Sequence, residues 1–524
     1  MADTTSAAVS RHGRLDGVTV STVLGDGFFT LTALEYREEL GEPFDLTVEL
    51  RCADPDVQGT KLVGQAFTVS LPLPNGQTRY IHAIMKSFAR IAGGVRDARY
   101  RAVGISWYSM LDLAETSRIF TNVNVRDLMN EVFANFSFAA YDLKGFEPKT
   151  TWATRTQYRE SFFNFLQRST QQEGVYHFWT HAASRHTLNF CDNLANHTPF
   201  PGYAGIPFKA VGQGLLTEEH VHEWNVETTL QPSTMVLRDY NYTDPTMNLE
   251  KTAGAMRPLG PSTLEVFDYP GLFDTTADAE RYAKIRMEER ECRQQVYRGR
   301  AQCLGLSAGF TFALTGHPAA GENRTYLTTS LTLSLGSDPA AGGSRGGKAT
   351  VDGHWYDCAF TAIPWEVQYR SRFSARIPQV LGLQPAFVYA PEGQDPQIPY
   401  TDSLGRIQVL FPWSRNSVQT AWVRKVQVAA GNGWGHMHCP RPGDEVLVAF
   451  EHGEVDRPVI VGCLFNGSTA TPLPLPAAAH IHVFKDQGGN VLSLNPQADG
   501  QTILVYSPVE NSWIVVGAGT PNPS

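Results

Sequence analysis

Residues 402–467 contain five short apolar segments that are separated by residues typical of turns. The turn residues include Gly-Asn-Gly at 431–433, Arg-Pro-Gly-Asp at 441–444 and a Gly-Glu-Val-Asp-Arg-Pro run that starts at Gly453. Short strands at intervals of roughly 8–12 residues are typical of a small closed barrel of the OB type. The predicted strands are Arg406–Phe411, Trp422–Val428, Trp434–His438, Glu445–Glu451 and Pro458–Leu464.

This barrel lacks the residue combinations that carry out reactions. Its sequence shows no convergent Ser/His/Asp set, no carboxylate pair and no stripe of basic and aromatic residues, so we interpret it as a scaffold. Trp434 lies between Gly433 and Gly435, and glycines allow close approach of the backbone. We therefore expect the large Trp434 ring to be buried on the packed face of the barrel.

Composition limits the remaining possibilities. A chain of 524 residues exceeds a single core and predicts three to four domains. The 43 Lys and Arg residues against 52 Asp and Glu residues give a net charge of −9, which argues against nucleic acid as a partner. The seven cysteines show no C-x-x-C pair, so neither a zinc ribbon nor a disulfide framework is indicated.

The N-terminal residues are polar and small, without the apolar core of a secretory signal, and the longest apolar stretches have strand length. We therefore expect synthesis in the cytoplasm, no signal peptide and no membrane-spanning helix.

Most of the chain upstream of the barrel shows strand patterns. Strands are predicted within 15–110 and again within about 298–387, with three helices between these blocks. Asn124 is placed to cap a helix over Val125–Phe136, and Ser161 to cap a second helix that Gly174 ends. The third helix is predicted over Ala277–Arg293. Isolated helices between strand blocks indicate a mainly β protein of the α+β class.

The chain after the spacer Thr471–Pro476 contains four more predicted strands and no helix to pack on them. Both faces of these strands carry apolar residues. So small a sheet cannot close a core alone, and one solution is three copies wrapped around an axis. The predicted strands are His480–Phe484, Asn490–Leu494, Thr502–Tyr506 and Ser512–Val516.

Five motifs of the barrel, in order, resemble those of the VgrG family, the valine–glycine repeat spikes of type VI secretion systems, which are related to the hub and spike of contractile phage tails. Upstream stretches such as Arg118-Ile-Phe and Glu173-Gly-Val-Tyr are similar to the hub of that family. The barrel residues that carry the resemblance are Gly405, Arg406, Trp422, Gly433, Trp434, Gly435, Pro440, Arg441, Gly443, Asp456, Arg457 and Pro458.

The resemblance implies three parts and a mechanical function. Residues 1–390 would form a tail-hub domain of two β-barrel subdomains with an α+β insert, 391–470 an OB-fold barrel, and 471–524 a short trimeric β-helix or prism. The homotrimer would seat on a hexameric inner tube and baseplate and transiently puncture a target membrane to deliver effectors. It would assemble in the cytoplasm and be injected or secreted by the machine.

The last predicted strand would end this spike in a blunt apolar surface, because Pro521 and Pro523 cannot extend a ladder. The resemblance implies that a PAAR-type tip protein, an effector or an adaptor docks on residues 507–524. The expected contacts are Trp513, Ile514, Val515 and Val516.

His480 and His482 share one face of a strand at the start of the trimeric segment. Three chains would supply six imidazole nitrogens, which suits an octahedral ion such as iron. We expect no other cofactor. The pairs His220/His222 and His436/His438 have the same spacing and are interpreted as surface or half-buried histidines.

The sequence offers little support for catalysis. The run Gly342–Ala349 resembles a P-loop but ends in Ala where Ser or Thr would bind magnesium, and no G-x-S-x-G elbow is present. The chain is therefore not expected to be an enzyme. The alternative is a phage-tail-like hub that hydrolyses cell walls, with acids such as Glu173 or Glu223 as candidates.

Overall fold

The structure is a computed structural model that describes residues 13–93, 98–210, 218–337 and 354–517. Close contacts divide the chain into two units, Met1–Pro378 and Gln379–Ser524. The P-loop-like run at 342–349 lies outside the described residues. The two units are described separately below.

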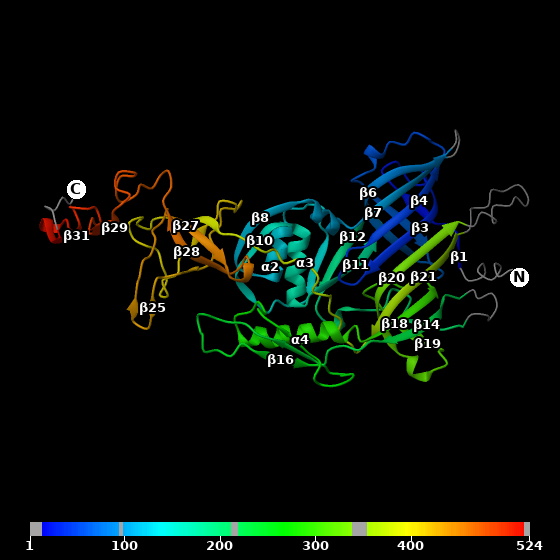
Figure 1. The fold of residues 1–524 in the computed structure, drawn as a ribbon. Helices are drawn as coiled ribbons and strands as arrows, with labels where there is room; N and C mark the ends of the chain where they lie inside the picture. Colours follow the sequence, from blue (N-terminus) through cyan, green and yellow to red (C-terminus); the bar gives the residue numbers. More distant parts are fainter. Residues whose placement is uncertain (1–12, 94–97, 211–217, 338–353, 518–524) are drawn as a thin grey trace, which may run out of the picture. The chain divides into compact units, whose positions relative to one another are not determined.

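One sheet of 13 strands organises the first unit (Figure 1). Its main path runs β14-β18-β21-β20-β3-β4-β7-β6-β5-β2, and β1, β13 and β19 attach at the side. The two predicted strand blocks are joined because β3 pairs antiparallel with β20. The strands are β1 (Gly13–Leu15), β2 (Thr19–Ser21), β3 (Thr30–Glu39), β4 (Asp45–Cys52), β5 (Ala66–Pro72), β6 (Thr78–Gly93), β7 (Ala98–Ile105), β13 (Gly205–Pro207), β14 (His220–Thr228), β18 (Gln295–Gln302), β19 (Thr311–Thr315), β20 (Thr325–Ser337) and β21 (His354–Pro364).

Smaller elements lie between these strand groups. Two strands, β8 (Glu115–Asn124) and β10 (Thr151–Ser161), pair with each other, and β9 (Tyr141–Gly145) joins the hairpin of β11 (Tyr176–Ala182) and β12 (Arg185–Cys191). The helices are α1 (Trp107–Met110), α2 (Val125–Phe133) and α3 (Phe162–Glu173).

The predicted helix caps are confirmed. The Asn124 side chain accepts hydrogen bonds from the backbone N–H groups of Arg126 and Asp127, each at 3.0 Å. Ser161 accepts from the N–H of Asn164 at 3.1 Å, and the left-handed Gly174, with φ of 74°, ends α3. Helix α2 ends three residues before the predicted Phe136.

This early end has a local cause. The Asn135 side chain donates to the carbonyl oxygens of Glu131 and Val132, at 2.8 and 2.9 Å, and so takes over the bonding of the last turn.

The third predicted helix is α4 (Thr276–Glu291), which follows the capping residue Thr275. It packs on a small sheet of β15 (Thr234–Leu237), β16 (Lys251–Gly254) and β17 (Glu265–Asp268) (Figure 1). Buried Met235, Tyr282 and Ile285 belong to the core between helix and sheet.

The barrel in the second unit is a five-stranded sheet of order β23-β22-β27-β28-β24. The two later predicted strands are confirmed as β27 (Glu445–Phe450) and β28 (Pro458–Leu464). The first two predicted strands are reduced to β23 (Val409–Leu410) and β24 (Arg424–Lys425). The third, predicted over Trp434–His438, is reduced to Trp434–Gly435 and lies outside this sheet. One side chain takes part in the pairing here, because the Thr420 hydroxyl accepts from the Val409 N–H at 3.1 Å.

One strand of the barrel was not predicted from the turn pattern. β22 (Gln384–Val388) lies before the expected boundary at 391, yet it pairs with both β23 and β27. The sheet of the barrel therefore begins earlier in the chain than the turn pattern indicated.

The family-like motif residues of the barrel act mainly in turns. Asp402 accepts from the N–H of Leu404 at 3.0 Å and of Arg406 at 2.9 Å, and Gly405 between them has a φ of 69°. Arg406 also pairs with the Asp402 carboxylate at 2.6 Å. These bonds give Asp402, Gly405 and Arg406 a structural part in the turn.

The expected burial of Trp434 is wrong. Its side chain is 72% exposed and lies in the hairpin of β25 (Ala430–Gly431) and β26 (Trp434–Gly435), outside the barrel core. A Cβ atom on Gly431 would lie 2.2 Å from the indole, so the glycine accommodates the ring of its own hairpin. The close approach was predicted correctly, but its partner is the hairpin and not the barrel interior.

The C-terminal strands are confirmed with small shifts in their bounds. β29 (His482–Lys485), β30 (Val491–Asn495), β31 (Thr502–Ser507) and β32 (Ser512–Gly517) form one antiparallel sheet in chain order. The fold class is thus confirmed as mainly β with some α, including an OB-type barrel.

We predict that Gly174→Ala lowers the free energy of unfolding by about 1–2 kcal/mol through its left-handed backbone alone. The new Cβ would also lie 2.9 Å from the Ile285 side chain on α4, which adds to the loss. Urea denaturation measures the change. Gly254→Ala is the matched control, because its Cβ meets nothing within 4 Å. Equal effects of the two substitutions would contradict the prediction.

Candidate functional site in the C-terminal sheet

Polar turns hold the strands of the C-terminal sheet in register. The Asp486 carboxylate accepts from the backbone and the side chain of Asn490, at 2.8 and 2.7 Å, which lowers the pKa of Asp486. At the next turn the Asn495 side chain accepts from the N–H of Gln497 at 3.1 Å. These are Asx-type turns, in which a side chain bonds the backbone two or more residues ahead.

The register places apolar residues of all four strands on one face of the sheet. One row across the strands is Phe484, Leu492, Val505 and Ile514, and the next is His482, Leu494, Ile503 and Val516. We call these two rows the apolar face. Its seven apolar side chains are between 44% and 65% exposed.

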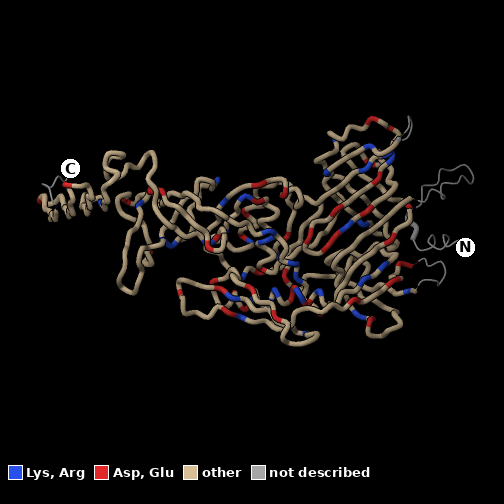
Figure 2. The backbone as a smooth tube through the Cα atoms, viewed as in Figure 1, with Lys and Arg blue, Asp and Glu red and all other residues tan. Residues whose placement is uncertain are grey.

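The opposite face is mixed. Its rows are Val483, Ser493, Leu504 and Val515, then Lys485, Val491, Tyr506 and Trp513. The charged residues between His482 and Gly517 are Lys485, Asp486, Asp499 and Glu510, and Figure 2 shows correspondingly little colour along this part of the tube. The sheet thus offers more apolar surface than a solvated hairpin array needs.

The strand β32 divides the four expected tip contacts between two faces. Ile514 and Val516 belong to the apolar face, whereas Trp513 and Val515 belong to the mixed face. Their assignment as partner contacts stays a prediction.

The two expected metal ligands lie at the start of this sheet. His482 is the first residue of β29 and His480 precedes it, and both are exposed. Within the described residues of one chain, no group of three or more His, Cys, Asp or Glu side chains could hold a metal ion. An axial site would therefore need ligands from further chains, and it stays a prediction.

The other histidine pairs have different surroundings. His220 and His222 are buried, so the expectation of a surface or half-buried pair is wrong for them, and burial lowers the pKa of His222. His436 and His438 belong to the second unit and are exposed.

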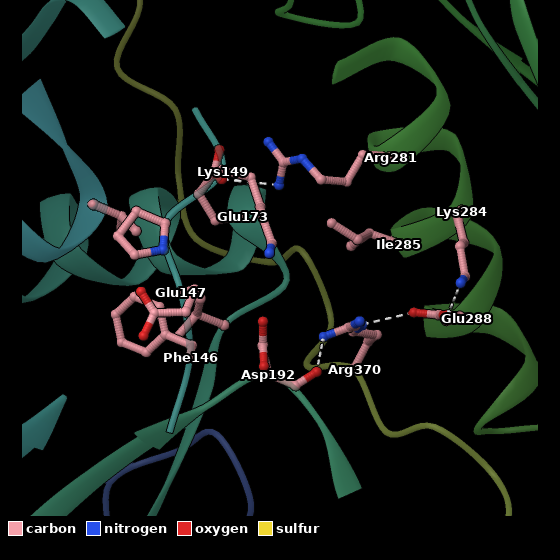
Figure 3. A pocket seen from close by; sticks show the side chains of 13 residues that line it. Phe146, Glu147, Lys149, Glu173, Asp192, Arg281, Lys284, Ile285, Glu288 and Arg370 are labelled. Atoms are coloured by element: carbon pink, nitrogen blue, oxygen red, sulfur yellow. Dashed lines mark hydrogen bonds and ion pairs between the residues drawn. The ribbon is translucent and has the colours of Figure 1, made fainter. Parts of the chain in front are cut away.

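A cleft of about 190 Å³ in the first unit contains Glu173, one of the acids considered for hydrolysis (Figure 3). The Glu173 carboxylate accepts from the Tyr282 hydroxyl and pairs with Arg281 at 2.9 Å, and its side chain is 3% exposed. Glu288 in the same cleft pairs with Arg370 at 2.8 Å. Both carboxylates are thus engaged in structural ion pairs.

Glu223, the second acid considered, is not among the residues that line this cleft. It lies in β14 of the large sheet, whereas Glu173 ends α3. The cell-wall hydrolase alternative is therefore not favoured.

The cysteines differ in their exposure to solvent. Cys52, Cys191, Cys292, Cys303 and Cys358 are buried and free, and Cys439 is half-buried. Cys463 differs, since it is exposed.

Among the helices that the structure describes, none is long and apolar enough to cross a bilayer.

Two family matches cover most of the chain. Residues 37–339 match the phage tail baseplate hub (GPD) family, and residues 397–465 match the type VI secretion system/phage-baseplate injector OB domain. The second match overlaps the five-stranded sheet described above.

Among curated relatives, the type VI secretion system spike protein VgrG1a of Pseudomonas aeruginosa is 32% identical over 88% of this chain. VgrG1b of the same species is 32% identical over 90%, and VgrG3 of Vibrio cholerae is 28% identical over 95%. The chain spans 71%, 63% and 49% of the lengths of these relatives, respectively.

Solved structures show the same fold at low identity. The E. coli c3393 protein, a type VI secretion component similar to the T4 bacteriophage tail proteins gp27 and gp5, has a TM-score of 0.58 at 19% identity, over 83% of this chain and 97% of that one. A chain of the lidded Francisella PdpA–VgrG complex has a TM-score of 0.64 at 8% identity, over 94% of this chain and 77% of that one. The identity to VgrG1a across most of the chain, together with the hub and OB-domain matches, shows that the chain belongs to the VgrG family of type VI secretion spike proteins.

Proposed function

We propose that three copies of this chain assemble into a hub and spike that act mechanically and without catalysis. The observation that carries the proposal is the apolar face of the C-terminal sheet, which stays exposed in the described part of the chain. Its seven apolar side chains are about half exposed, and covering each contributes roughly 1 kcal/mol. Three copies would cover this face around a common axis and leave the mixed face toward solvent.

The barrel supplies a second apolar surface for neighbouring chains. Around its exposed hairpin, Val428 is 90% exposed, Met437 86% and Trp434 72%. Large apolar side chains that one chain leaves in water are typical of surfaces buried on assembly. This interpretation also accounts for a tryptophan outside the barrel core.

The hub would meet the remainder of the injection machine. If the strand groups on either side of the β3–β20 pair act as two similar barrels, three chains would offer six similar surfaces to a hexameric inner tube. The trimer would then cap the inner tube, puncture a target membrane and deliver effectors. It would assemble in the cytoplasm and leave the cell through the machine.

We predict that Ile503→Lys shifts the purified chain from trimer toward monomer, because it places a charge in the middle of the apolar face. Light scattering coupled to size-exclusion chromatography measures the mass. Ser493→Lys, on the mixed face of the neighbouring strand, is the control and should leave the trimer intact. A parent chain that is monomeric at micromolar concentration would overturn the proposed assembly.

The tip contacts give a second test. We propose that a PAAR-type tip protein, or an effector adaptor, docks on the end of the spike at residues 507–524. Trp513→Ala should weaken capture of the tip by the intact trimer at least tenfold, since aromatic anchors dominate interfaces. Lys485→Ala is the control, because Lys485 lies in the same row at the opposite edge of the sheet. Capture that survives removal of 507–524 would place the docking surface elsewhere.

The axial metal is the third part of the proposal. Six imidazoles from His480 and His482 of three chains would bind one octahedral ion such as Fe²⁺. After dialysis against Fe²⁺, metal analysis should find one ion for three chains, and the double substitution to Ala should abolish it. The same double substitution at His436 and His438, which have equal spacing, is the control. Equal iron in both variants would refute the site.

A further inference from the structure

Three histidines, one from β6 and two from the β11–β12 hairpin, meet inside the first unit. His82 lies in β6, His181 in β11 and His186 in β12. The ring centre of His186 lies 5.0 Å from that of His82 and 6.0 Å from that of His181. His82 and His186 are 6% and 2% exposed, and Phe44 and Trp179 pack against the His186 ring.

The hydrogen bonds around His186 fix the positions of two protons. Its Nε2 accepts from the backbone N–H of Trp107 at 2.8 Å. In a neutral ring the hydrogen must then be on Nδ1, which donates to Nδ1 of His82 at 2.8 Å. His82 therefore carries its own hydrogen on Nε2.

The third ring is fixed in the same way. Nδ1 of His181 accepts from the backbone N–H of His82 at 3.2 Å. The Tyr36 hydroxyl donates to the Glu38 carboxylate at 2.9 Å, so its oxygen accepts from Nε2–H of His181 at 3.0 Å. On each of the three rings, the nitrogen that would take a second proton already accepts a hydrogen bond. Protonation would place two hydrogens against each other.

Charged groups nearby also oppose protonation. The Arg79 guanidinium lies 3.6 Å from Glu38 and donates to the carbonyl oxygens of Leu304 and Leu306. Burial and then Arg79 lower the pKa of His181 to about 3. Burial and then the neighbouring rings lower the pKa of His186 to about 2, and burial lowers the pKa of His82.

The groups that face the cluster come from several elements. Tyr36 and Glu38 lie on β3, Arg79 on β6 beside His82, and His177 on β11 behind the Trp179 ring. Glu38 is the acidic group among these residues. Its carboxylate accepts hydrogen bonds from the Tyr36 and Ser307 hydroxyls and from the N–H of Ala308. Among these groups, no carboxylate without hydrogen-bond partners is present to stabilise an imidazolium.

We propose that His82, His181 and His186 form an acid-sensitive latch, which fastens the β11–β12 hairpin to β6 near neutral pH and releases it in acid. The latch ties together β3, β6, both strands of the hairpin and the start of α1. It adds a regulated junction to the hub, and it does not depend on the proposed trimer.

The direction of the pH effect follows from linkage. The folded pKa values lie below the ordinary histidine value of about 6.5, so the open state binds more protons than the closed state. Stability of the junction is complete above about pH 6.5 and falls as the pH drops toward 3. Each imidazole that stays neutral in the closed state and takes a proton on opening makes the opening constant about tenfold larger per pH unit in this window.

Hydrogen-exchange mass spectrometry on the full chain tests the latch. After correction for intrinsic exchange, peptides within 78–86 and 176–191 should open with a steep pH dependence between pH 6.5 and 5. His186→Gln keeps an acceptor for the Trp107 N–H but cannot take a proton. For the same peptides, the change in the opening constant per pH unit should be about tenfold smaller than in the parent chain, even if the substitution weakens the junction at pH 8. His436→Gln, an exposed histidine of the second unit, should leave the slope unchanged.

Nuclear magnetic resonance of the parent chain provides a test that needs no variant. Imidazole nitrogens of the three rings should stay neutral to at least pH 5, with hydrogen on Nε2 of His82 and His181 and on Nδ1 of His186. Titration of any of these rings near pH 6.5 would overturn the proposal. It would also be overturned if opening of the hairpin did not depend on pH, or if His186→Gln kept the parent slope.

Discussion

The pairing of β3 with β20 holds the hub unit together as one sheet. Seven residue pairs, from Ser330↔Glu39 to Gly336↔Ala33, connect strand groups that are almost 300 residues apart in sequence. Glu38, next to this seam, is a buried carboxylate that accepts from Ser307 and from the N–H of Ala308 in the other strand group. A buried charge is costly unless it is fully bonded, so the seam tolerates little displacement.

The C-terminal sheet of the second unit differs, because it buries little apolar surface within one chain. The barrel has a core of its own, which includes Val446, Val448 and Ile460, whereas the apolar face of the C-terminal sheet stays exposed in the described chain. Covering this face with partner chains would therefore contribute free energy to association and not to the folding of one chain. A hub that folds alone and a spike completed by neighbours would separate folding from assembly.

The sequence predicted local features better than distant ones. The caps Asn124 and Ser161 and the strands β27 and β28 were predictable because their signals lie within a few residues. The burial of Trp434 could not be predicted, because neighbouring glycines allow the backbone to approach a ring closely but do not indicate which part of the chain does so. Likewise His82 lies 99 and 104 residues from His181 and His186, and no local pattern reports such a contact.

Acid would act differently on the two units. The hub contains neutral imidazoles whose hydrogen bonds leave no place for a second proton. The rows of the C-terminal sheet contain mostly side chains that do not titrate, and three of its four charged residues lie in turns. An acidic environment would therefore loosen the β11–β12 hairpin before it weakens the apolar contacts of a spike. The stiffness needed for penetration and the sensitivity to pH would then belong to separate parts of the same chain.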